Sequence, residues 1–393
     1  MVSIIDITFV FVFLIHVCVS QSAWNENSDL RASRSALMKS LGLKRVPRNV
    51  ASQSEFLLRR YSAPKFMMGL FREVNSDRFS HPVNSAPAAA STKNSSYGNV
   101  DHYEIERKYL DETKVDTVIS FFKYDHDKSW NRIHKEFKIK FKTNFNSQED
   151  IVKGGELKLF KRGPRNRNMT HELCSVAVYL ITAEEKPAKL LDKREVHAWK
   201  TGWQTFNITD AIRMWAVFPQ TNYGLKVVVH HIHEELSPSA FGIVGTRGNL
   251  AKRPYIIAFV ATTRVFPTFS SELLAHSRDR RDTREKREDS TNNCKLKKFY
   301  VSFKEIGLDG SIIAPKGYEM SFCQGLCVHP FDAVPHTSHA IVQSLYHLYD
   351  SSTPEPCCVP GRMKSENLLF FDNDKNIVLK QHPDMTATSC ACN

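Results

Sequence analysis

The sequence predicts two regions of different fold: an α+β amino-terminal region and a small, disulfide-rich β module at the carboxyl end. Seven of the nine cysteines lie in the last hundred residues. Short runs of alternating apolar residues, typical of strands, recur through residues 116–266. With 393 residues the chain is long enough for two or three domains.

The cysteines of the module form three clusters, preceded by Cys294: Cys323-x-Gly325-x-Cys327, Cys357-Cys358 and Cys390-x-Cys392. The first and last clusters close a small ring if each cysteine of one pairs with a cysteine of the other. A third disulfide threads such a ring only where the adjacent backbone lacks a Cβ, which Gly325 provides. This is the pattern of a cystine knot.

Zinc binding is the alternative interpretation of clustered cysteines. Zinc sites favour paired C-x2-C units, whereas the spacings here are three, zero and one. The chain also carries the features of an exported protein, and oxidising compartments favour disulfides. We therefore expect disulfides, with no metal and no cofactor.

Charge is unevenly distributed along the chain. Residues 288–393 hold nine Lys and Arg against twelve Asp and Glu, a formal −3, so the first 287 residues carry +15 of the total +12. No nucleic-acid-binding motif accompanies the basic region. We expect no nucleic-acid partner.

The amino terminus resembles a cleaved leader. Residues 4–19 are almost wholly apolar and small residues follow, which predicts a signal peptide over residues 1–20. A short membrane anchor is the alternative. No later stretch is long and apolar enough to span a bilayer, so we expect no membrane span and a secreted, extracellular product.

Residues 29–77 show helical periodicity interrupted by Pro47 and Pro64, which predicts two helices joined by an extended strap. Residues 78–115, rich in Ala, Ser and Asn, resemble a linker. Residues 116–266 predict an antiparallel β-sandwich. Three N-x-S/T sequons, at Asn94, Asn168 and Asn207, indicate glycosylation in the secretory pathway.

A dense charge run lies in residues 267–287. It holds R-x-K/R-R twice, as Arg278 to Arg281 and as Arg284 to Arg287, the pattern that furin-like convertases cleave. Charged runs are solvated and extended, as a protease cleft requires. We expect cleavage after Arg287, with Arg281 as a secondary site, which divides the chain into a propeptide (21–287) and a mature module (288–393).

The mature module predicts two β-hairpin fingers and one helix. Residues 299–303 and 318–323 alternate as one hairpin, and residues 367–372 and 377–381 form a second. Residues 338–350 carry a helical apolar face, with Thr337 or Ser338 as N-cap.

The chain resembles the transforming growth factor-β superfamily, in particular its bone morphogenetic protein branch. In the module the resemblance rests on 312–315, 317–318, 323–327, 339–343, 357–360, 378–380, 384–385 and the final C-x-C. In the propeptide it rests on residues 62–67, 202–210 and 253–259. Within that branch the propeptide leans towards the glass bottom boat and screw group.

The resemblance implies the disulfides Cys294–Cys358, Cys323–Cys390 and Cys327–Cys392. It leaves Cys357 to bridge two chains, and an odd cysteine count independently predicts an intermolecular bond. The product would be a homodimer, or a heterodimer with another bone morphogenetic protein.

The resemblance also implies two receptor surfaces. A convex surface, the knuckle, would bind type II receptor serine/threonine kinases, and a concave one, the wrist, would bind type I receptors. The knuckle positions are Ala314, Pro315, Asn367, Leu368, Leu369 and Leu379. The wrist positions are Leu308, Ser311, Phe331 and His339. Leu308 and Ser311 replace two tryptophans of the family pattern, which puts ordinary type I affinity in doubt because tryptophan is a favoured binding anchor.

These features predict a secreted growth-factor precursor whose cleaved dimer activates receptor kinases and SMAD signalling. A cystine-knot antagonist that occupies receptors or ligands without signalling is the alternative, favoured by the lost tryptophans. An enzyme is not expected, because the sequence contains no H-E-x-x-H, G-x-S-x-G or Gly-rich phosphate loop.

Overall fold

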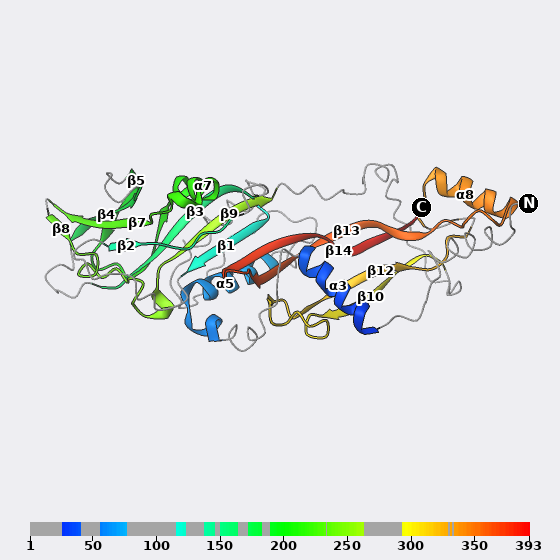
Figure 1. Ribbon diagram of the computed structural model, residues 1–393, viewed down its shortest axis with the longest axis horizontal. Coiled ribbons are helices and arrows are strands. Elements are labelled where there is room, and N and C mark those ends of the chain that lie inside the picture. The colour runs from blue at the N-terminus through cyan, green and yellow to red at the C-terminus, as the bar shows by residue number, and fades with distance from the viewer. Residues whose placement is uncertain are drawn as a thin grey trace, which may run out of the picture.

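A computed structural model describes residues 26–40, 56–76, 115–122, 137–145, 150–163, 172–182, 189–232, 234–262, 293–328, 331 and 334–393. We refer to residues 26–76 as the strap, 115–262 as the arm and 293–393 as the module. The molecule is elongated, with the arm at one end and the module helix α8 (Ser338–Tyr349) at the other (Figure 1).

The strap forms the helices expected from its periodicity. These are α3 (Glu26–Ser40), a helical turn at 56–60 and α5 (Ser62–Ser76). Pro64 does not separate two helices but lies in the first turn of α5, where its missing N–H leaves no helical bond unmade. α5 buries Phe66, Met67 and Leu70 against the rest of the protein.

The arm is an antiparallel sandwich, as expected. One sheet contains β1 (Thr117–Phe122), β9 (Tyr255–Thr262), β3 (Asp150–Lys161) and β6 (Gly202–Asn207) in that order. The other contains β2 (Phe137–Ile139), β7 (Leu225–His231), β4 (Leu173–Leu180) and β5 (Lys189–His197), with β8 (Glu234–Leu236) paired to β7. The short helices are α7 (Thr209–Val217), η3 (Pro219–Thr221) and η4 (Leu250–Lys252).

The core of the arm lies between its two sheets. Alternate residues point inward, for example Leu157 and Leu159 of β3 opposite Val176 and Val178 of β4, and all four are buried. This period of two is what packs one face of each strand and exposes the other. Trp215 of α7 belongs to the same buried cluster.

The module consists of two long hairpins and α8. Finger one pairs β10 (Lys295–Ser302) with β12 (Gly317–Gln324), and finger two pairs β13 (Cys358–Phe371) with β14 (Ile377–Cys392). The short strand β11 (Ile312–Ala314) joins the edge of finger two through β13. Finger two is considerably longer than residues 367–381, because its strands continue to the cysteines at its base. The small β module is confirmed.

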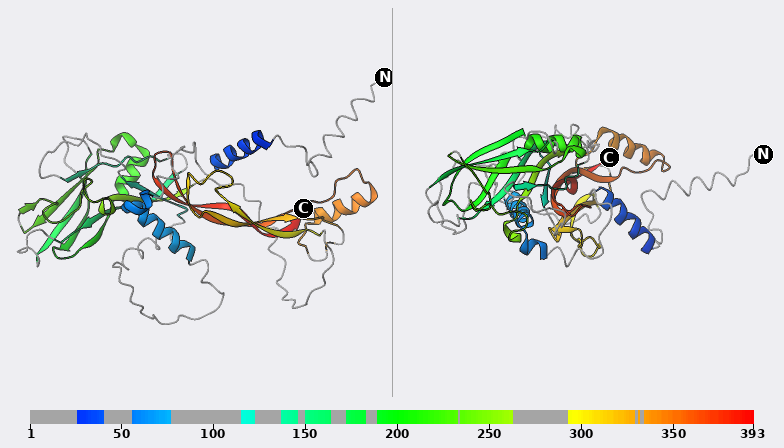
Figure 2. Two further views of the ribbon diagram at one scale, coloured as in Figure 1. Left: turned by 90° about the horizontal axis from the view of Figure 1, so that it is seen from below. Right: turned by 60° about the vertical axis from the view of Figure 1, so that its left-hand side comes forward.

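Finger two continues the sheet of the arm. β14 pairs antiparallel with β1, with Thr117 opposite Lys380 and Ser120 opposite Ile377 at the two ends of the ladder. The full sheet runs β11-β13-β14-β1-β9-β3-β6, so strands of the module and the arm share one set of backbone hydrogen bonds. Figures 1 and 2 show the long hairpin reaching from the arm towards α8. Among the described residues, none of the helices is long and apolar enough to cross a membrane.

Candidate functional site

Three disulfides tie the base of the two fingers together. They join Cys294 to Cys358, Cys323 to Cys390 and Cys327 to Cys392, with Cα separations of 5.5, 5.7 and 5.7 Å. These are the pairs that the family resemblance implies. The cystines form a small core of their own, into which Phe331 and Ala340 are packed. Each closes a loop of more than sixty residues and is worth roughly 3–5 kcal/mol.

Gly325 is required by the path of the chain through the ring. Its φ is +131°, a conformation that side chains rarely adopt. A Cβ at this position would lie 2.3 Å from the carbonyl oxygen of Asn293 and 2.7 Å from the amide nitrogen of Cys294. The backbone leading into the threading disulfide therefore fills the space that a side chain would need.

The zinc interpretation is not supported at these cysteines. The sulfurs of Cys294, Cys327 and Cys392 lie within 4.8 Å of one another, but each belongs to a different disulfide. A metal would need thiolates, which a disulfide does not offer. Cys174 is buried in β4 of the arm, and burial raises the pKa of its thiol, with Glu172 adding to the effect. This favours a structural thiol over a reactive one.

Cys357 lies outside the three disulfides and is half-buried. Its backbone exchanges two hydrogen bonds with Asn393, of 2.9 and 3.0 Å, which fixes it beside the carboxyl-terminal residue. Thr337 begins α8 as its N-cap, because its Oγ1 accepts a hydrogen bond of 3.1 Å from the amide of Ala340.

The knuckle positions divide between two faces of finger two. Ala314, Leu369 and Leu379 lie together in one apolar cluster. Leu368 faces the opposite way and packs into the cluster that includes the arm core. Because successive residues of a strand point to opposite faces, Leu368 cannot share a surface with Leu369. Pro315 is partly exposed beside Ala314.

Helix α5 of the strap covers the face that holds Leu369. The same cluster contains Phe66, Met67 and Leu70 of α5, and Leu369 and Met67 are fully buried. At the end of the helix the Nδ2 of Asn367 donates a hydrogen bond of 3.2 Å to the Oδ1 of Asn75. In the intact chain, therefore, α5 occupies the knuckle face.

The four wrist positions do not converge on one surface of this chain. Leu308 and Ser311 are buried near the tip of finger one, in or beside the main core cluster. Phe331 is buried in the cystine core, and His339 is exposed on α8. Leu308 is wholly inaccessible here, so it is a packing residue of the loop and not an exposed substitute for tryptophan.

Helix α3 lies against the same loop of finger one. A guanidinium nitrogen of Arg34 donates a hydrogen bond to the carbonyl oxygen of Gly307, and Leu37 and Met38 pack against the cluster that contains Leu308. Gly307 has a φ of +71°, and a Cβ there would lie 2.8 Å from the Arg34 Nη1. The absence of a side chain at 307 thus lets the strap helix approach.

The tip of finger two is a turn built by Asp372. Its Oδ1 accepts hydrogen bonds of 2.8 Å from the amides of Asp374 and Asn376, and its Oδ2 accepts one from the Asn376 side chain. Burial raises the pKa of Asp372, while these bonds oppose the shift. The turn presents Asp374 to the arm, where Lys142 and Asn144 contact its carboxylate. The sequence analysis did not identify this contact, because its partners lie 230 or more residues apart.

The loop that carries Lys142 and Asn144 is firmly held. Phe141 is buried in the arm core, and Phe145 packs edge-on against Phe121 with ring centroids 5.2 Å apart. The buried Asn222 side chain donates 2.9 and 3.0 Å hydrogen bonds to the Phe141 carbonyl and the Thr143 hydroxyl. The two donors therefore meet Asp374 from a fixed position.

Two family models match this chain over nearly its whole length. The TGF-beta propeptide model matches residues 16–259, and the transforming growth factor beta like domain model matches residues 293–392. The chain belongs to the transforming growth factor-β superfamily. It is a precursor of the bone morphogenetic protein branch, with the strap and the arm in the propeptide and the cystine knot in the growth-factor-like domain.

Individual relatives agree with the branch. The chain is 29% identical to bone morphogenetic protein 4 of Mus musculus over 301 residues, covering 71% of this chain and 72% of the relative. It is 26% identical to bone morphogenetic protein 4 of Gallus gallus over 387 residues, covering 92% and 86%. This membership also supports the expectation that the chain is not an enzyme. The finer placement in the glass bottom boat and screw group stays a prediction.

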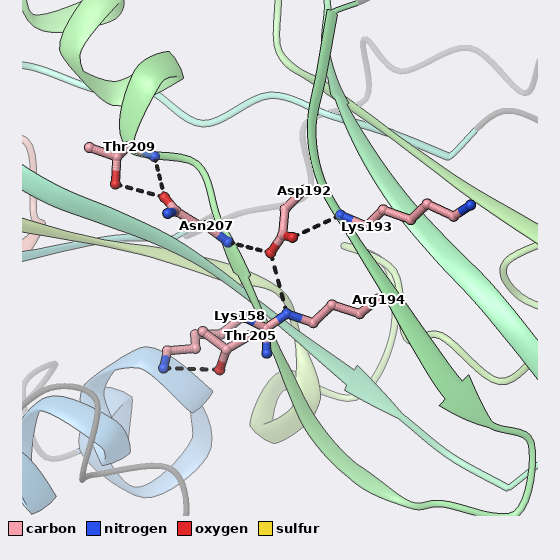
Figure 3. A network of polar contacts seen from close by, with 7 residues as sticks. All are labelled: Lys158, Asp192, Lys193, Arg194, Thr205, Asn207 and Thr209. Carbon is pink, nitrogen blue, oxygen red and sulfur yellow. Dashed lines mark hydrogen bonds and ion pairs between the residues drawn. The ribbon is translucent and has the colours of Figure 1, made fainter.

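Of the three sequons in the propeptide, the structure describes only Asn207. It is exposed between β6 and α7, and its Oδ1 accepts hydrogen bonds from the amide and the hydroxyl of Thr209, of 3.0 and 2.7 Å. Its own amide donates to Asp192 at 2.9 Å (Figure 3). Asn94 and Asn168 lie outside the described residues, as do the leader and the convertase arginines Arg278, Arg281, Arg284 and Arg287.

Proposed function

We propose that this precursor is exported, cut by a furin-like convertase after Arg287, and released as a disulfide-linked dimer that activates receptor kinases. Residues 1–20 would be the leader, 21–287 the propeptide and 288–393 the mature growth factor. Type II and type I receptor serine/threonine kinases would be its partners and SMAD proteins its intracellular effectors. Export is supported by the apolar leader, the three sequons and the disulfides.

One observation carries the proposal. The apolar face formed by Ala314, Leu369 and Leu379 is buried under α5 of the propeptide. An apolar face of this kind, exposed only when a removable segment departs, fits a binding surface better than a permanent core. The propeptide would therefore both chaperone the module and cover its knuckle until release.

A second candidate is an antagonist that binds receptors or ligands without signalling. It is favoured by the finger-one loop, where Leu308 is buried and offers no aromatic anchor to a type I receptor. A ligand with an intact knuckle but a weak wrist would occupy type II receptors unproductively. A heterodimer with another bone morphogenetic protein would restore one intact wrist.

A reporter assay on cultured cells separates the two candidates. The purified mature dimer is applied alone and in competition with an active bone morphogenetic protein. An agonist raises SMAD-dependent transcription by itself, whereas an antagonist only lowers the response to the competitor. As a control, the precursor with Arg278, Arg281, Arg284 and Arg287 changed to Ala should release no mature fragment and give no response.

A further inference from the structure

A basic pocket lies on the propeptide where the strap meets the arm, away from the knot. It has a volume of about 460 Å³ and is lined by Arg59 and Arg60 on one side and by residues 248–251 on the other. We call it the strap–arm pocket. Nothing in the proposed signalling function uses it.

Two segments distant in sequence bring positive charge to this pocket. Residues 56–65 and 245–254 together contain six Lys and Arg and no Asp or Glu. Arg59, Arg60 and Arg247 are exposed, and Lys252 is partly exposed with its Nζ 4.5 Å from the ring centroid of Phe160. Folding thus gathers cations that the sequence keeps almost two hundred residues apart.

The base of the pocket is rigid. The buried Ser62 hydroxyl donates a 2.7 Å hydrogen bond to the Arg253 carbonyl, which joins α5 to the loop after η4. The Nε of Arg253 donates a 3.1 Å bond to the carbonyl of Gly248 and so holds the opposite wall. Asn249 caps η4 by accepting a 2.9 Å bond from the amide of Ala251. Such a fixed site loses little conformational entropy when it binds.

The exposed cations are mainly arginines, which bind planar or tetrahedral oxyanions through two parallel N–H donors. The Arg60 guanidinium lies 5.0 Å from the ring centroid of Phe56 on the same helical turn, which restrains its side chain. Cations spread over both walls of one pocket fit a chain of anions better than a single anion. The ligand class is therefore a polyanion with doubly accepting oxyanion groups.

We propose that the strap–arm pocket binds a sulfated segment of an extracellular polysaccharide. The choice of a polysaccharide over a nucleic acid rests on the export proposed above. Sulfate esters remain ionised throughout the physiological pH range and offer three oxygens to an arginine fork. Binding here leaves the cystine knot untouched, so it would hold the propeptide and its bound growth factor at a cell or matrix surface.

Heparin is the probe for this proposal. The purified precursor carries Ala at Arg278, Arg281, Arg284 and Arg287, which keeps it uncleaved and removes the competing basic run. Its affinity for immobilised heparin is measured over a series of salt concentrations, beside the variants R59A/R60A, R59K/R60K and K193A/K200A. Lys193 and Lys200 are exposed on the arm in and just after β5, and they provide a control with the same loss of charge.

Removing Arg59 and Arg60 should lower the slope of log affinity against log salt by about two, because two ion contacts to a linear polyanion are lost. K193A/K200A should leave the slope unchanged. R59K/R60K should keep the slope but bind more weakly, since lysine lacks the fork. Equal slopes for R59A/R60A and the control variant would overturn the proposal.

The chemistry of the ligand is tested with the same protein. Desulfated heparin and polyglutamate, which carry carboxylates alone, should compete poorly. If polyglutamate competes as well as heparin, the pocket serves an acidic protein segment and the polysaccharide assignment is wrong. Both measurements use purified protein, so they stand or fall independently of receptor activation and of export.

Discussion

The ammonium Nζ of Lys142 in the propeptide arm lies 2.5 Å from the Oδ1 of Asp374 at the tip of finger two. The Nδ2 of Asn144 donates to the other carboxylate oxygen at 2.9 Å, so both oxygens are engaged by the arm. This clamp lies at the end of the ladder that β1 forms with β14. It is well placed to hold the register of a ladder of only four residue pairs.

We predict that reversing the charge of Asp374 weakens retention of the cleaved propeptide. D374K should shift the complex towards free propeptide in size-exclusion chromatography at 0.1 M salt, and K142E/D374K should restore it. Lys142 is largely exposed, so the expected effect is about 0.2–1 kcal/mol and should shrink at high salt. K140E is the control on the same loop, and an equal effect from it would refute a specific clamp.

The clamp should not depend on pH near neutrality. Hydrogen bonds from Lys142 and Asn144 lower the pKa of Asp374, and the bond to Asp374 raises the pKa of Lys142. For a carboxyl with a lowered pKa, the stabilisation is lost only as pH falls through that value, which lies below the ordinary pKa of about 4. Complex stability should therefore show no contribution from this pair between about pH 5 and 9.

We predict that Gly325→Ala prevents correct assembly of the knot. The added Cβ would meet the backbone at Asn293, which no side-chain rotation relieves. Secreted protein should fall sharply, and peptide mapping should find mispaired cysteines. Gly361→Ala is the matched control, because a Cβ there meets its nearest atom only at 3.2 Å. Normal yield and pairing for Gly325→Ala would show that the ring tolerates a side chain.

His382 in β14 should make the stability of the precursor fall with acidification. Burial lowers the pKa of His382 to about 4, with Lys380 adding to the shift, and its ring lies 6.0 Å from that of Phe370. The unfolded chain takes up the proton near pH 6.5 and the folded chain only near pH 4, so stability falls between those values. The loss is on the order of 3 kcal/mol at most.

The measurement is the thermal midpoint of the intact precursor at pH 7 and at pH 5. His382→Gln should narrow the difference between the two midpoints, even though it lowers both by disturbing the packing. His336→Gln, at an exposed position, is the control and should leave the difference unchanged. If His382→Gln also leaves it unchanged, another group is responsible for the pH dependence.

We predict that the mature protein is a covalent dimer through Cys357. Six of the seven module cysteines are paired within the chain, and Cys357 is the one left outside those pairs. Non-reducing electrophoresis of Cys357→Ser should show a monomer, which can still associate through non-covalent contacts. A persistent disulfide-linked dimer in this variant would contradict the assignment.

The sequence alone was sufficient for the features that depend on local patterns. Cysteine spacing indicated the knot, alternation indicated the hairpins and the sandwich, and helical periodicity indicated α5 and α8. It did not indicate β5, whose residues Lys189–His197 are largely polar because the strand lies at a sheet edge and exposes most of its side chains. Nor did it indicate how far β13 and β14 extend, since their basal residues lack strict alternation.

The contacts between propeptide and module were out of reach for a different reason. The pairing of Ser120 with Ile377 and the contact of Lys142 with Asp374 join segments more than 230 residues apart, and no local preference encodes such pairings. Leu368 is the opposite case. The strand period of two already separates it from Leu369, so the sequence contained the reason to assign only one of them to the knuckle.

The burial of Leu369 and Leu379 under α5 is the central claim, and type II receptor binding tests it most directly. The immobilised extracellular part of a type II bone morphogenetic protein receptor is exposed to equal amounts of cleavage-resistant precursor and of mature dimer freed from its propeptide. The account predicts that the free dimer binds and that the precursor binds at least roughly tenfold more weakly, because α5 must first leave the knuckle. Equal affinity for the two forms would contradict it.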